Sequence, residues 1–121
     1  MRAELKRLHS PDAPDLARFV PEDPLRFSIL VQALVGPEGT EAEESFDLRV
    51  CSIEWLRDLV QSRPVIGVHH LVVDRYDYNK VFSTIARFCE KCQGPTWTDV
   101  AMRLSRLGSW EFDGYTQGPT M

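Results

Sequence analysis

Residues 25–52 read LRFSILVQALVGPEGTEAEESFDLRVCS, and this stretch decides the fold. Apolar side chains fall on every second residue from Leu25 to Val35, and the same alternation returns from Phe46 to Val50. A period of two is typical of strands that turn one face toward a hydrophobic core. Between the two runs, residues 36–44 contain two glycines, a proline and four glutamates, which is the composition of a solvated turn. The stretch therefore predicts a β-hairpin with a negatively charged tip.

The size and composition of the chain indicate one globular domain, which we place at residues 1–121. It has 121 residues, of which 43% are apolar and 26% charged. No apolar run approaches the roughly 20 residues that a membrane helix needs, and the N-terminus lacks the apolar core of a signal peptide. These features predict a cytoplasmic protein that contacts no membrane. Three cysteines, an odd number, favour free thiols over a disulfide framework.

The rest of the chain predicts two further strands and three helices around the hairpin. Ser52 and Thr96 are expected N-caps, since a hydroxyl there accepts an otherwise unpaired backbone N–H. In chain order, the expected elements are a strand at 3–8, a proline-rich loop across the sheet at 10–24, the hairpin, a helix from 53 that Arg63-Pro64 closes, an inner strand at 65–73, helices at 78–91 and 97–107, and a short strand or ordered cap from 109. This order predicts an α+β fold with a small, mostly antiparallel sheet and helices on one face. The apolar stripe of the first helix predicts a core role for Trp55.

Charge is distributed unevenly along the chain. Segments 12–24 and 36–47 hold nine acidic side chains against Arg18 alone, within a net charge of −4. This balance argues against direct binding to nucleic acid and favours a basic protein partner, although acidic loops also serve solubility. The tail from Trp110 interleaves aromatic and acidic residues, a pattern that suits either core packing or a partner contact. The candidate partner-binding residues are Glu38, Glu41, Glu43, Glu44, Asp47, Glu111, Asp113 and Tyr115.

Catalytic and metal-binding patterns are weak. Cys89 and Cys92 fall at the C-terminal end of a predicted helix, where the helix dipole opposes ionisation of a thiol. A zinc site would also need Cys51 and either His69 or His70, and neighbouring histidines on a strand point to opposite faces. The chain lacks a nucleophile elbow, a glycine-rich phosphate loop and a His-Glu-x-x-His motif. We therefore predict no enzyme, no cofactor and no metal. A small metal or thiol protein built on the three cysteines stays an alternative.

Several short motifs, in their order along the chain, resemble the immunity protein 8 family. The matching segments are residues 1–6 (MRAELK), 21–24 (PEDP), 44–47 (ESFD), 50–56 (VCSIEWL) and 110–112 (WEF). The family is encoded beside the toxins of bacterial polymorphic toxin systems, and its tryptophans map onto Trp55 and Trp110. The resemblance implies an α+β protein that binds a toxin domain made by the same cell and blocks it. It brings no catalytic residues.

Two classes of function follow from these observations. In the first, the acidic hairpin tip, with segment 12–24 beside it, docks on a basic toxin domain; by analogy, a nuclease with a positive nucleic-acid groove would suit this charge. In the second, the cysteines form a metal or thiol site. A homo-oligomer that uses the edge of the sheet is a third alternative.

Overall fold

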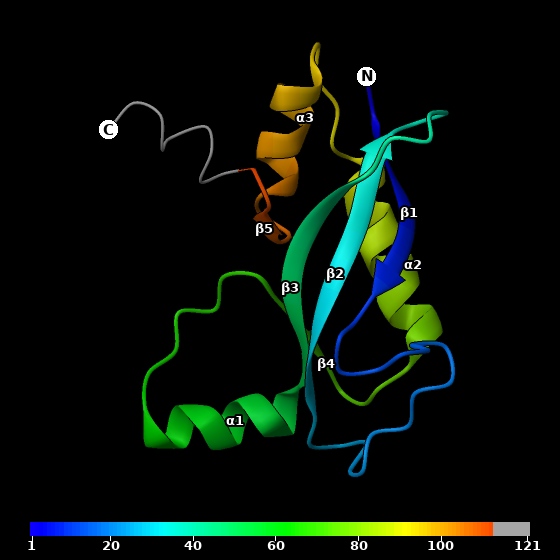
Figure 1. The fold of residues 1–121 in the computed structure, drawn as a ribbon. Coiled ribbons are helices and arrows are strands. Elements are labelled where there is room, and N and C mark those ends of the chain that lie inside the picture. The colour runs from blue at the N-terminus through cyan, green and yellow to red at the C-terminus, as the bar shows by residue number, and fades with distance from the viewer. Residues whose placement is uncertain (113–121) are drawn as a thin grey trace.

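The protein folds into one mixed sheet with three helices, and the computed structural model describes residues 1–112 (Figure 1). The elements are β1 (Ala3–His9), β2 (Ser28–Pro37), β3 (Glu44–Ser52), α1 (Ile53–Ser62), β4 (His70–Val73), α2 (Tyr78–Glu90), α3 (Trp97–Leu104) and β5 (Ser109–Trp110). None of these helices has both the length and the hydropathy to span a bilayer.

The sheet confirms the predicted fold class. Its strand order is β1-β2-β3-β4, with β5 beside the N-terminal half of β3. The hairpin pairs β2 with β3 in antiparallel register, so that Val31 lies opposite Leu48 and Ala33 opposite Phe46. Only the pairing of β3 with β4 is parallel among the residues that the structure describes. The α+β fold with a mainly antiparallel sheet is therefore as predicted.

One face of the sheet and the inner faces of two helices form the hydrophobic core. The alternation seen in the sequence is real, because every second residue of β2 and β3 is buried. From β2 and β3 these are Ile29, Val31, Ala33, Val35, Phe46, Leu48 and Val50; α2 contributes Val81, Ile85 and Cys89, and α3 contributes Val100, Ala101 and Leu104. Thr96 caps α3 as predicted, by accepting the backbone N–H of Asp99 at 3.2 Å.

The proline-rich loop packs against the end of this core. Leu16 is buried, and the Tyr76 hydroxyl donates to its carbonyl at 2.5 Å. The rings of Phe19 and Phe27 both meet Tyr76 edge-on, with centroids 5.1 and 5.5 Å away. Asp23 holds the next residues in a turn, since its carboxylate accepts the Leu25 N–H at 3.0 Å and its carbonyl the Arg26 N–H at 3.1 Å. Strand β2 therefore begins at Ser28 and not at Leu25. The loop lies at the end of the sheet opposite the hairpin tip (Figure 1), so segment 12–24 does not lie beside the tip as expected.

Helix α1 differs from its expected place in the core. Ser52 caps it as predicted, accepting the Trp55 N–H at 3.2 Å, and Arg26 lies within 3.4 Å of the Asp58 carboxylate. None of its residues is buried, however, and Trp55 is only partly covered. Figure 1 shows α1 projecting from the end of the sheet, where it has little of the core to cover. The predicted core role for Trp55 is therefore wrong: the apolar stripe exists, but β3 and β4 cover it only in part, and Val60 is exposed.

Strand β4 is shorter than predicted and lies at an edge. The expectation of an inner strand over 65–73 is wrong, because β3 offers β4 only the positions from Arg49 to Ser52. The other half of that edge of β3 is taken by β5. Residues 65–69 therefore run past the sheet, and Ile66 and Val68 are 85% and 60% exposed.

Candidate functional site

The hairpin tip, residues 37–43, carries three of the predicted contact residues. Its turn is closed by Thr40, whose N–H and hydroxyl both donate to the Pro37 carbonyl, at 3.2 and 2.8 Å. Gly39 has a φ of 78°, the left-handed conformation that glycine adopts without strain. The start of β1 supports the turn from the side, because the Glu38 N–H donates to the Arg2 carbonyl at 2.8 Å. The tip is thus a defined structure, held by bonds within its turn and by one backbone bond to the N-terminal segment.

The negative charge of the tip is largely matched by Arg2, which precedes β1, and by Arg7 within it. Arg2 donates to the Glu38 carboxylate from Nε (2.8 Å) and Nη2 (2.5 Å), and Arg7 donates to the Glu43 carboxylate from Nε (3.1 Å) and Nη2 (2.8 Å). These pairs raise the pKa of both guanidinium groups, and all four side chains keep contact with water. Glu41 is exposed and forms no ion pair or hydrogen bond within residues 1–112. It is the tip carboxylate most available to a partner.

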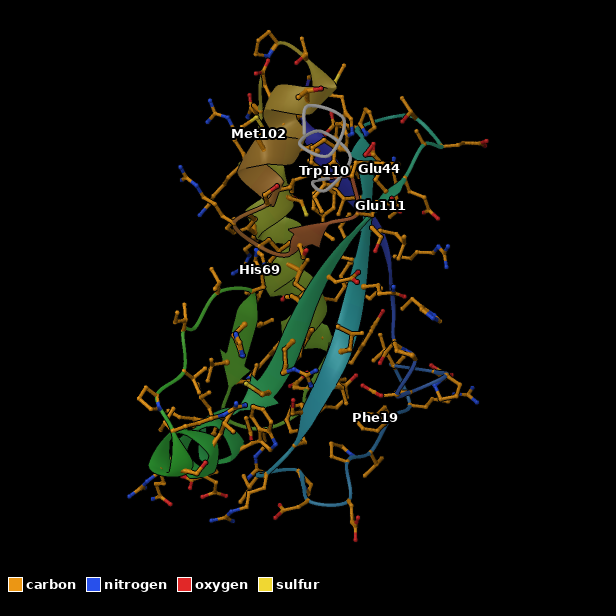
Figure 2. All side chains as sticks on the ribbon, turned by 60° about the vertical axis from the view of Figure 1, so that its left-hand side comes forward. Phe19, Glu44, His69, Met102, Trp110 and Glu111 are labelled. Atoms are coloured by element: carbon orange, nitrogen blue, oxygen red, sulfur yellow. The ribbon has the colours of Figure 1, made fainter. Side chains whose placement is uncertain are left out.

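Glu44 lies at the base of the tip and bonds two tryptophans. Its carboxylate accepts the indole N–H of Trp97 at 2.9 Å and that of Trp110 at 3.1 Å. The Trp110 ring stacks on Phe46 with an interplanar angle of 9°. Figure 2 shows Glu44 and Trp110 meeting at the junction of the sheet and α3. The Glu44 cluster, defined as Glu44, Trp97 and Trp110, therefore holds α3 and β5 against β3.

Of the remaining predicted contact residues, Glu111 and Asp47 both form hydrogen bonds with Ser45. Glu111 is engaged with Ser45, whose backbone N–H donates to the Glu111 carboxylate at 2.7 Å and whose carbonyl accepts the Glu111 N–H at 3.1 Å. Asp47 accepts the Ser45 hydroxyl at 2.7 Å on the half-exposed face of β3. Asp113 and Tyr115 lie outside the described residues.

The histidines and cysteines do not assemble as a metal site would require. His69 precedes β4 with a φ of 56°, and its Nε2–H donates to the Ser105 carbonyl at 2.7 Å, so its expected placement inside the strand is wrong, whereas His70 is the first residue of β4. His70 bonds the Val68 carbonyl through Nδ1 at 2.6 Å. Within residues 1–112, no three side chains of the His, Cys, Asp and Glu types are grouped so that they could hold a metal ion.

The three thiols are buried and poorly suited to redox chemistry. Burial raises the pKa of Cys51, Cys89 and Cys92, that of Cys89 to about 12. A reactive thiol needs the opposite shift, toward thiolate at neutral pH. The cysteines therefore act as small apolar side chains of the core.

Comparison with known proteins identifies the family of the chain. No curated protein and no solved structure matches the chain. The family model described as Immunity protein 8 matches residues 3–115, which is nearly the full length and includes both the hairpin and the Glu44 cluster. The chain therefore belongs to the immunity protein 8 family.

Proposed function

We propose that this protein binds a toxin domain made by the same cell and blocks it by stoichiometric, non-covalent association. Membership of the immunity protein 8 family carries the proposal. The inhibitor acts by obstruction, and none of its own side chains makes or breaks a bond. Apolar side chains that the fold leaves exposed on α1 and at residues 65–69 support a protein partner, because such surfaces are typical of interaction sites.

Co-expression with the toxin tests this function directly. The C-terminal toxin domain encoded beside this gene should kill cells alone and spare them when this protein is present. The two chains should co-elute as a complex with one copy of each, measured by light scattering. A neighbouring gene without a lethal product, or protection without a complex, would overturn the proposal.

We further propose that the hairpin tip forms part of the toxin contact, as the sequence led us to expect. Glu41 is the side chain to change, because Glu38 and Glu43 are paired with arginines and Glu44 holds two indoles. Glu41→Lys should slow association with the toxin roughly three- to tenfold at low salt and flatten its salt dependence, because charge steering acts mainly on the association rate. Stopped-flow mixing at several salt concentrations measures both effects.

Glu22→Lys is the matched control for this variant. Glu22 is likewise exposed and forms no ion pair or hydrogen bond within residues 1–112, but it lies in the loop at the other end of the sheet. Its reversal changes the net charge equally and should leave the association rate nearly unchanged. Equal rates for the two variants would remove the tip from the interface.

A further inference from the structure

The C-terminal ends of α2 and α3 enclose a small hollow lined by cations. Its walls are Phe88, Lys91, Cys92, Arg103 and Arg106, and its volume is about 200 Å³. This is below the roughly 300–1,000 Å³ of sites for drug-sized ligands, but it has room for one or two side chains. A second, larger depression shares Arg103 and Arg106 and is also lined by Pro95, Asp99 and Met102, the last of which is 64% exposed. We call the first depression the cationic hollow.

The cations of the hollow lie near one carboxylate but are not paired with it: Asp99 lines the neighbouring depression together with Arg103 and Arg106. Within residues 1–112, none of Lys91, Arg103 and Arg106 forms an ion pair, whereas each cation of β1 has one. Arg103 and Arg106 lie three residues apart beside the end of α3, so their charges repel one another. Their positive charge reaches the Cys92 thiol, where it opposes the effect of burial on the pKa. A cation at each helix end suits the helix dipole, but the dipole does not remove the repulsion within the cluster.

The chemistry of the hollow fits carboxylates presented by a protein. With a net charge of −4, the chain as a whole would repel a nucleic acid, which binds best to broadly basic domains. The apolar Phe88 and Met102 beside the arginines suit a side-chain contact better than a bare phosphate chain. We propose that the cationic hollow binds an acidic segment of the toxin domain, with one or two carboxylates entering between Lys91, Arg103 and Arg106. This inference rests on the proposed function.

The hollow and the hairpin tip lie at the same end of the molecule. The Ala3 N–H donates to the Cys92 carbonyl at 3.0 Å, and Arg2 bridges to Gln93, so the segment after α2 runs beside the start of β1. The start of β1 in turn supports the tip through the pairing of Ala3 with Pro37. One toxin surface can therefore cover both features. Contacts of opposite sign at neighbouring positions fix the register of a complex and reject wrong partners.

A double charge reversal tests the proposal. Arg103→Glu/Arg106→Glu should weaken binding to a catalytically inactive toxin domain about 30-fold or more, since the carboxylates then meet like charge. Arg103→Gln/Arg106→Gln, which removes the charge without adding repulsion, should lower the affinity about tenfold. Calorimetric titration measures the affinities, and thermal unfolding of each free variant shows whether it has folded.

The control keeps the change of net charge but moves it away from the hollow. Arg18→Glu/Arg75→Glu alters two exposed arginines on other loops and should leave the affinity within about threefold. Failure of the wild-type protein to bind the toxin would overturn the proposed function itself. If the wild-type protein binds the toxin and the Arg103→Glu/Arg106→Glu variant binds it with the same affinity, only the proposal for the cationic hollow is overturned. Two other results would also overturn that proposal. In the first, the wild-type protein forms a dimer and the variant does not. In the second, the wild-type protein binds a 20-base-pair DNA duplex and the variant does not.

Discussion

Gly36→Ala is expected to destabilise the protein by about 3 kcal/mol or more, or to prevent folding. Gly36 is buried near the end of β2, where the hairpin tip folds back over it. A Cβ added there would meet the Ala42 carbonyl oxygen and lie 2.7 Å from its carbonyl carbon. Both atoms belong to the backbone, so no side-chain rotation relieves the clash. Urea unfolding followed by tryptophan fluorescence measures the decrease in the free energy of unfolding.

Gly67→Ala is the matched control for this substitution. A Cβ at Gly67 meets nothing within 4 Å, and the residue is not in the left-handed region. The variant should be as stable as the wild type, or more stable by about 0.4–1 kcal/mol through the smaller entropy of its unfolded chain. Equal stability of Gly36→Ala and the wild type would show that the tip does not close over β2 in solution.

The sequence predicted the hairpin because its signal is local. One face of β2 and of β3 is buried along nearly the whole strand, so apolar residues recur at the period of the strand itself. Turn residues separate the runs, and Ser52 and Thr96 mark helix starts within one turn of the backbone N–H groups that donate to them. Each of these features depends on residues close together in the chain.

The misplaced elements depend on partners that are distant in the chain. Residues 65–69 have strand-like composition, but β5, about 40 residues later, occupies the part of β3 that a longer β4 would need. Helix α1 carries an apolar stripe like those of α2 and α3, and a stripe alone does not specify what covers it. Whether the apolar side chains of α1 are exposed depends on the tertiary arrangement and cannot be read from the helix sequence alone.

The same limit applies to the candidate site. A run of glutamates predicts a wet, charged turn, and this holds for Glu41. It gives no sign that Arg2 and Arg7, 36 residues away, pair with Glu38 and Glu43.

The cationic hollow was not predicted from the sequence for a related reason. Its lysine and arginines are separated by 12 to 15 positions and become neighbours only after the turn at Gly94-Pro95. The available signal in the sequence was the presence of cations near the ends of two consecutive predicted helices.

Glu44→Ala is expected to lower the free energy of unfolding by about 2–3 kcal/mol. Its carboxylate is the acceptor for both the Trp97 and Trp110 indole N–H groups, and Trp110 is only 8% exposed. Hydrogen bonds to a charged group are worth about 1.5–3 kcal/mol each, discounted here because Glu44 is partly exposed. Without the carboxylate, the indole of Trp110 loses its acceptor in a nearly closed space. Urea unfolding, with β5 probed by hydrogen exchange, should show this end of the sheet opening first.

Three further variants separate the hydrogen bonds from the loss of volume. Glu44→Gln keeps one carbonyl acceptor and should lose only about 1 kcal/mol. Trp110→Phe keeps a ring over Phe46 but removes the indole N–H donor. A double-mutant cycle of Trp110→Phe and Glu44→Ala should therefore give a coupling energy of about 1 kcal/mol between the two side chains. Glu41→Ala, an exposed glutamate without a partner in residues 1–112, should stay within about 0.5 kcal/mol of the wild type.

The Glu44 variants also decide how the tip should be tested against the toxin. Because Glu44 positions α3 and β5, reversing its charge disturbs the framework of the tip and of α3, whose end lines the cationic hollow. Loss of protection in such a variant would follow from unfolding even if Glu44 never touched the toxin. Protection by Glu44→Ala should therefore recover at low temperature, where the destabilised protein is folded, whereas a lost contact would weaken binding at every temperature. A stable Glu44→Ala protein that fails to bind would instead make Glu44 a contact residue.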